Sequence, residues 1–314
     1  MAFLNAKEPV DYVNPNMGGI SHTLKPTHPT VQLPNSMLRV FPRRAEFNDA
    51  QIDALPLAVC AHRSAGQIAL EVFSGEAGGL SERAYPRKYF YDAETITPYS
   101  YEVFLEGENV AVKFAPSSKS AIYSFDFSEA KDAARNIKIR VPNGSARAFE
   151  NGISAEENLP NGAKIRIYMA FSKTPSRVEI SKSGKSATAV FENCERQIFA
   201  KYAVSYISFE RAKSTLEREI ADFDLEGLAA RGRKIWNEKL SKIKVEGSED
   251  DKAVFYTSLW RVYERMVDAS EYGAHYNPSS ASAENSDAPF YVDDWIWDTY
   301  RTSHPLRILI DAEL

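Results

Sequence analysis

The feature that most constrains the fold is a long succession of strand-like segments between residues 55 and 208. In these segments apolar and polar residues alternate with a period of two, and turn-forming residues separate one segment from the next. Examples are residues 67–73, 99–105, 121–127, 164–171 and 198–207. Because none of the intervening stretches has the pattern of a long helix, a parallel α/β fold is disfavoured. We expect a mainly β protein with a large antiparallel β-sandwich.

The periodicity changes from two to about 3.6 at Glu210. Apolar residues then recur at helical spacing as far as Ile243, with an interruption at 224–232, where two glycines weaken a continuous helix. Ser248 followed by Asp251 matches a capping box, which predicts the start of a third helix. Residues 268–289 have loop composition and predict a rim or lid.

The stretch 291–305 is dense in aromatic and acidic residues and contains Trp297, Asp298 and Arg301. Such side chains bind polyhydroxylated ligands through ring faces and charge-assisted hydrogen bonds. If the stretch is helical from Asp294 onward, Asp294 and Asp298 share one face and Arg301 follows on the same side. The commoner use of these residue types is packing and a local ion pair, so the stretch alone does not decide between structure and binding.

The loop-like region 11–42 contains His22 and His28. Two histidines six residues apart match no standard metal-binding spacing, and no third ligand follows them. We therefore expect hydrogen bonds that fix the loop, and no metal site.

Composition narrows the class of protein. The chain has 314 residues, a net charge of −5 and 44% hydrophobic residues, which predicts a well-cored protein without a nucleic-acid partner. The longest apolar run, 54–61, is too short for a membrane span, and residues 1–7 lack the features of a secretory signal. Cys60 and Cys194 lack metal spacing; two free thiols are expected, with one long-range disulfide left open.

Three motifs in order resemble glycoside hydrolase family 92, the calcium-dependent, exo-acting α-mannosidases. They are an opening motif at 12–23 that includes His22, the segment 255–260, and the segment 297–306 with its Trp-Asp-Thr signature. The resemblance implies a β-sandwich at 1–209, a helical linker at 210–247, and the start of an (α/α)6 catalytic barrel, apparently truncated, at 248–314. The loop after the opening motif departs from the family pattern at 26–28 and 33–36.

The resemblance also implies the chemistry. The chain is expected to be the amino-terminal part of an inverting exo-α-mannosidase that removes terminal α-linked mannose, for example α-1,2-linked, from glycans. Trp297 and Asp298 would line the mannose pocket, with His22 near it and Arg301 a weaker candidate. The calcium ligands and both catalytic carboxylates would come from later barrel segments, so no catalytic or metal-binding residue is expected in this chain.

Asp294 and Asp298 are not expected to be the catalytic pair. One helical turn separates their Cβ atoms by about 5–6 Å, whereas inverting hydrolysis needs carboxyl groups about 6.5–9.5 Å apart. Asp293 and Asp294 are interpreted as solvated or capping residues.

Two other functions remain open at this point. One is a non-catalytic carbohydrate-binding or assembly module derived from such an enzyme, and the other is a related sandwich-and-barrel enzyme such as a glycoside phosphorylase. The expected partner is a mannose-containing oligosaccharide or N-glycan. By resemblance, the expected location is periplasmic or extracellular.

Overall fold

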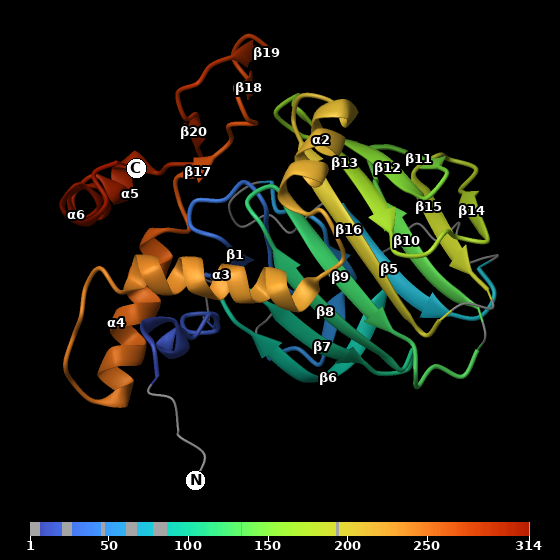
Figure 1. Cartoon of the computed structure of the whole chain (residues 1–314), viewed down its shortest axis with the longest axis horizontal. Helices are drawn as coiled ribbons and strands as arrows, with labels where there is room; N and C mark the ends of the chain where they lie inside the picture. The colour runs from blue at the N-terminus through green and yellow to red at the C-terminus, as the bar shows by residue number, and fades with distance from the viewer. Residues whose placement is uncertain are drawn as a thin grey trace.

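The computed structural model describes residues 7–20, 27–44, 48–60, 68–77, 87–132, 134–192 and 195–313. Two antiparallel sheets make up a β-sandwich, and a group of helices lies at one end of it (Figure 1). The predicted fold class, a large antiparallel sandwich followed by helices, is confirmed.

The larger sheet has nine strands. Their order across the sheet is β11 (Gly144–Phe149), β12 (Gly152–Asn158), β13 (Lys164–Phe171), β16 (Gln197–Ser205), β9 (Ser120–Asp126), β8 (Val110–Pro116), β7 (Tyr101–Leu105), β6 (Lys88–Ile96) and β3 (Gln51–Asp53). The smaller sheet has the order β14 (Arg177–Ile180), β15 (Ser186–Phe191), β10 (Arg135–Arg140), β5 (Ala69–Ser74) and β4 (Leu55–Pro56).

The sandwich core lies between the inner faces of these sheets. Strand β13 illustrates why the sequence folds this way, since Ile165, Ile167, Met169 and Phe171 are buried while the residues between them are less so. This is the alternation that a strand with one buried face requires.

Three short strand pairs complete the β structure. They are β1 (Val31–Gln32) with β2 (Arg39–Val40), β17 (Val267–Asp268) with β20 (Tyr291–Val292), and β18 (Ala274–Asn277) with β19 (Ser282–Asn285). The last pair is a hairpin inside the region predicted to be a loop. That prediction was wrong there, because the pairing of Tyr276 with Ala283 gives order to a segment whose composition carries no strand signal.

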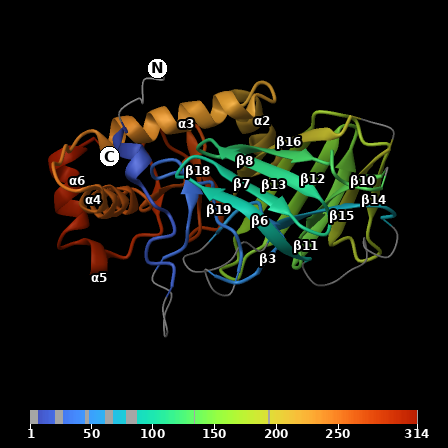
Figure 2. The same ribbon diagram turned by 90° about the horizontal axis from the view of Figure 1, so that it is seen from below.

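The helices are η1 (Pro9–Tyr12), α2 (Phe209–Glu219), α3 (Leu225–Leu240), α4 (Glu249–Val262), α5 (Ile296–Thr299) and α6 (Ser303–Ile310). Two helices pack apolar side chains on the outer face of the larger sheet. These side chains are Leu216 in α2, Ile220 at its end, and Leu225 and Leu228 in α3. In the turned view α3 runs alongside the strands (Figure 2). Ser248 and Asp251 make the predicted capping box at the start of α4.

The interruption between α2 and α3 is shorter than predicted, because both glycines lie inside α3. A Cβ on Gly227 would lie 1.9 Å from the Asp224 carboxylate, which caps the helix by accepting from the Gly227 amide. A Cβ on Gly232 would lie 3.0 Å from Tyr99. Glycine therefore serves capping and close packing here, and does not end the helix.

A second core joins the helices to the sandwich. Trp236 of α3 is fully buried against Trp260 of α4 and against Tyr263, the C-cap of that helix. Its Nε1 donates to the Gln32 carbonyl at 2.7 Å. Gln32 belongs to β1, so this indole fixes α3 to the strands as well as to α4.

The opening motif lies against α4. The ring of Tyr12 stacks on Tyr256 with centroids 5.8 Å apart, and the Asn14 amide donates to Thr257 Oγ1 at 2.9 Å. Arg261 donates to the carbonyls of Pro15 and Met17 at 3.0 Å each. Two of the motifs that carried the resemblance are therefore in direct contact.

Within the described ranges, every helix is too short or too polar to cross a lipid bilayer.

Candidate functional site

The aromatic-acidic stretch, residues 291–305, begins with β20, contains the single turn α5 and ends in α6. Trp297 is 85% exposed, and Asp298 and Arg301 are exposed as well. The Arg301 guanidinium lies over the Tyr300 ring, 5.4 Å from its centroid, and its Nε donates to the Tyr300 hydroxyl at 2.6 Å. The stretch thus presents an indole face, a carboxylate and a guanidinium to solvent.

The expected helical face does not exist, because α5 begins only at Ile296 and spans four residues. Asp294 precedes it and is bound from two sides: Thr299 Oγ1 donates to its Oδ1 at 2.9 Å, and His304 Nε2 lies 3.0 Å from its Oδ2. The interpretation of Asp294 as a solvated or capping residue is wrong. It instead ties α5 to the start of α6.

Asp293 is likewise not a solvated residue. Its carboxylate pairs with the nearly buried Arg39 of β2 and lies 3.9 Å from Arg265 Nε. Burial lowers the pKa of Arg265, and the nearby Asp293, Asp294 and Asp298 carboxylates oppose this shift. The Arg265 guanidinium also lies over the Trp295 ring. A chain of charge and ring contacts thus connects the sandwich to the exposed stretch.

The Arg39–Asp293 pair yields a stability prediction. We expect Asp293→Asn to lower the free energy of unfolding by about 3 kcal/mol, because the buried Arg39 loses its closest counter-charge. Asparagine tolerates the backbone φ of 58° at this position, so the loss reports the charge. Urea unfolding measures it, with the exposed Asp287→Asn as the control. A loss no larger than that of the control contradicts the assignment.

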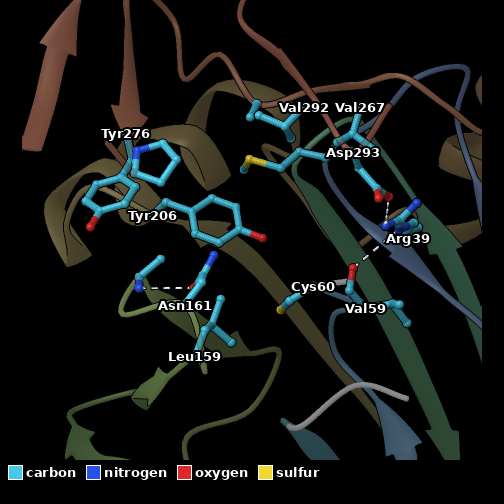
Figure 3. A pocket seen from close by; sticks show the side chains of 14 residues that line it. Arg39, Val59, Cys60, Leu159, Asn161, Tyr206, Val267, Tyr276, Val292 and Asp293 are labelled. Atoms are coloured by element: carbon cyan, nitrogen blue, oxygen red, sulfur yellow. Dashed lines mark hydrogen bonds and ion pairs between the residues drawn. The ribbon is translucent and has the colours of Figure 1, made fainter. Parts of the chain in front are cut away.

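A pocket of about 270 Å³ lies beside this ion pair (Figure 3). Arg39 and Asp293 stand at one end of it, and Cys60, Tyr206 and Tyr276 form part of its wall. Its walls come from the sandwich and from the strands β17, β18 and β20. Trp297, Asp298 and Arg301 do not line this pocket.

Burial raises the pKa of the Cys60 thiol to about 11, and the nearby Tyr206 side chain opposes this shift. We expect iodoacetamide at pH 8 to alkylate Cys60 roughly 100-fold more slowly in the folded protein than in urea, because the thiolate is the nucleophile. The measurement uses a Cys194→Ser background, so that only one thiol reports. Equal rates in the two states would contradict the raised pKa.

The same raised pKa fixes a pH dependence of stability. The folded state keeps the Cys60 proton up to about pH 11, while the unfolded thiol loses it at lower pH. Keeping the Cys60 thiol neutral therefore stabilises the folded protein. The stabilisation is fully present below the pKa of the thiol in the unfolded chain, and it is lost as the pH rises through the pKa of the thiol in the folded protein.

His22 lies outside the described residues, as does Cys194. His28 is described: its ring stacks on Phe41 with centroids 4.2 Å apart, and its carbonyl accepts from Arg261. Over the described part of the chain, no group of three or more His, Cys, Asp or Glu side chains is placed to hold a metal ion.

Sequence reasoning missed Arg39, Tyr206 and Tyr276 as pocket residues. A signal existed for Arg39, since a single charge inside the apolar run 37–41 indicates a buried ion pair. No comparable signal marks the two tyrosines, because they meet only through the folding of segments far apart in sequence.

Comparison with known proteins identifies both parts of the chain. The model of the glycosyl hydrolase family 92 N-terminal domain matches residues 12–221, and that of the glycosyl hydrolase family 92 catalytic domain matches residues 211–314. No curated protein matches the chain.

Solved structures agree in fold. An inverting mannosidase of family GH92 from Bacteroides thetaiotaomicron VPI-5482 has a TM-score of 0.82 and 20% identity, over 96% of this chain and 46% of that one. An α-mannosidase of the same family from Bacteroides thetaiotaomicron, in complex with mannoimidazole, has a TM-score of 0.81 and 18% identity, over 96% and 46%. The chain spans about half the length of these solved relatives, and the likeness at such identities shows the fold.

Proposed function

The chain belongs to glycosyl hydrolase family 92, and from that premise we propose that it is the amino-terminal part of an inverting exo-α-mannosidase. Its substrate would be a glycan with terminal α-linked mannose, for example α-1,2-linked. The proposed boundaries remain a sandwich at 1–209, a linker at 210–247 and the first barrel helices from 248.

The observation that carries the proposal is the exposure of Trp297. Trp297, at 85% exposed, lies in an apolar patch with Ile296 and Tyr300, which are 69% and 47% exposed, and such a patch marks a binding surface. Asp294, Thr299 and His304 hold the turn that presents it. An indole face can stack on the apolar C–H side of a sugar ring. We take the sugar to be mannose because the chain belongs to family 92.

Asp298 and Arg301 would act beside this ring. The Asp298 carboxylate would accept hydrogen bonds from sugar hydroxyls, and the Arg301 guanidinium would donate them. His22 would approach from the sandwich side. All four residues are proposed to bind substrate, and none is proposed to transfer a proton.

The catalytic acid and base are proposed to come from later barrel segments, outside residues 1–314. Asp294 is unsuited to either role, because its two carboxylate oxygens are engaged by Thr299 and His304. It is a positioning residue for the turn. The inverting pair must also leave space for the attacking water, which requires a separation of about 6.5–9.5 Å.

Calcium is proposed as the cofactor, with ligands from later barrel segments outside residues 1–314. When bound, calcium would polarise sugar hydroxyls. We expect EDTA to reduce mannoside hydrolysis to background and added calcium to restore it. Hydrolysis that EDTA does not reduce would contradict the calcium proposal. The proposal that the sugar is mannose would be unaffected by that result.

The proposed partner is a mannose-containing oligosaccharide or N-glycan, and the proposed location is the periplasm or the cell exterior. Separating the cell compartments of the source organism and following the protein by antibody tests the location. Detection only in the cytoplasmic fraction would contradict it.

The test of the proposal compares two proteins: residues 1–314 alone, and the same chain with whatever carboxy-terminal sequence its gene carries. With α-1,2-mannobiose, we expect turnover only by the longer protein and at most binding by residues 1–314. Turnover by residues 1–314 would overturn the location of the acid and base. Binding without turnover by both proteins would favour a carbohydrate-binding module.

A further inference from the structure

A second hollow adjoins the pocket under the β18–β19 hairpin. It has a volume of about 350 Å³ and is lined on one side by Lys164 and Arg166 of β13 and on the other by Ser282 of β19. Tyr206 and Tyr276 line both hollows. The two hollows are therefore neighbours along one groove, which we call the hairpin groove, between the sandwich and the hairpin.

The cationic side chains that line the hairpin groove have acidic partners. Arg39 pairs with Asp293. Glu156 receives both Lys164 Nζ and Arg166 Nε, each at 2.9 Å, so one carboxylate serves two cations. The Lys164 side chain is 46% exposed, so solvent screens its charge, while the less exposed Arg39 and Arg166 each have a carboxylate in contact. A groove whose less exposed cations are compensated offers little to an anionic ligand, and one without a surplus of carboxylates offers little to a cation. The charge pattern therefore fits a neutral ligand.

The remaining groups fit a ligand with alternating polar and apolar faces. Tyr206 and Tyr276 contribute rings, and the apolar wall includes Leu159 and Val292. Asn161, in the turn between β12 and β13, accepts from the Ala163 amide, and its side chain lies near Tyr206 (Figure 3). Aromatic rings together with a few fixed polar groups are the usual lining of a small-molecule site, and a sugar offers matching apolar faces and polar edges.

The groove also leads toward the exposed stretch. Asp293 stands at its end, and Arg265 connects Asp293 to Trp295, which immediately precedes α5. A ligand bound at Trp297 could therefore extend past Trp295 and Arg265 to Asp293, where the groove begins.

We propose that the hairpin groove binds the distal, non-reacting residues of a neutral oligosaccharide whose terminal mannose lies at Trp297. The inference rests on the proposed function and deepens it, because it assigns the chain a preference for long glycans over mannose itself. Binding energy from distal residues is available to orient the reacting residue.

The test maps binding by hydrogen exchange, with mannose and with an α-1,2-linked mannotetraose at saturation. We expect the tetraose to protect residues 159–166, 274–283 and 295–302, and mannose to protect 295–302 only. Tyr276→Ala should weaken tetraose binding at least 10-fold and change mannose binding less than twofold. The matched control is Phe90→Ala, an exposed aromatic residue on β6, where no change is expected.

The outcomes separate the two claims. If the tetraose protects only 295–302 and Tyr276→Ala binds it normally, the groove inference fails and the proposed function stands. If neither sugar binds residues 1–314, the groove inference fails, and the proposed function is decided by the turnover comparison described above. Exchange in the unsubstituted protein decides the question even if Tyr276→Ala does not fold.

Discussion

Trp297→Ala is expected to lower kcat/KM for α-1,2-mannobiose about 100-fold, which corresponds to about 2.7 kcal/mol of lost transition-state binding. The reason is that the indole provides the proposed platform for the sugar ring, and alanine leaves that face open. The assay uses the chain with the carboxy-terminal sequence of its gene.

The exposure of Trp297 makes this substitution a clean probe. Because the side chain is 85% exposed, its removal should change the midpoint of thermal unfolding by no more than about 2 °C. Phe90→Ala, also at an exposed aromatic residue, should leave both activity and stability unchanged. Activity that survives Trp297→Ala would remove Trp297 from the sugar site.

Trp236→Ala is expected to have the largest effect on stability, a loss of about 3–5 kcal/mol, because it opens a cavity between α3 and α4. It also leaves the Gln32 carbonyl without the indole donor that reaches it at 2.7 Å. Chemical unfolding followed by circular dichroism measures the loss.

Two variants distinguish the contributions at this position. Trp236→Phe keeps a ring but removes the hydrogen bond, so its loss should be smaller than that of the alanine variant. Ile235→Ala changes the neighbouring, partly exposed residue and should cost less than about 1 kcal/mol. A similar loss at both positions would mean that Trp236 does not join the two parts of the fold.

The sandwich was predictable because its signal is local. In β13, buried and exposed residues alternate within eight residues, and this pattern requires no knowledge of the partner strands. The capping box of Ser248 and Asp251 is also local and was predicted correctly. The family was recognisable because its motifs are contiguous segments.

The site was less predictable because its determining contacts are not local. Arg39 and Asp293 are 254 positions apart, and neither residue shows in sequence that it pairs with the other. Asp294 was misinterpreted because α5 begins two residues later than assumed, and Thr299 and His304 then become its partners. The sugar-binding roles of His22, Trp297, Asp298 and Arg301 stay predictions.

The α6 helix contains both packed and exposed apolar residues. Leu306 and Ile310 pack against the helical core, whereas Ile308 and Leu309 are 69% and 82% exposed. Two of these four apolar residues therefore have partners within the described part of the chain, and two face solvent.

The measurement that tests the central claim most directly is the anomeric configuration of the first mannose released from α-1,2-mannobiose, followed by proton NMR with the chain and the carboxy-terminal sequence of its gene. Inversion predicts that β-mannose appears first and then mutarotates to the equilibrium mixture. Initial release of α-mannose, or no release of mannose, would contradict the claim that this chain is part of an inverting α-mannosidase.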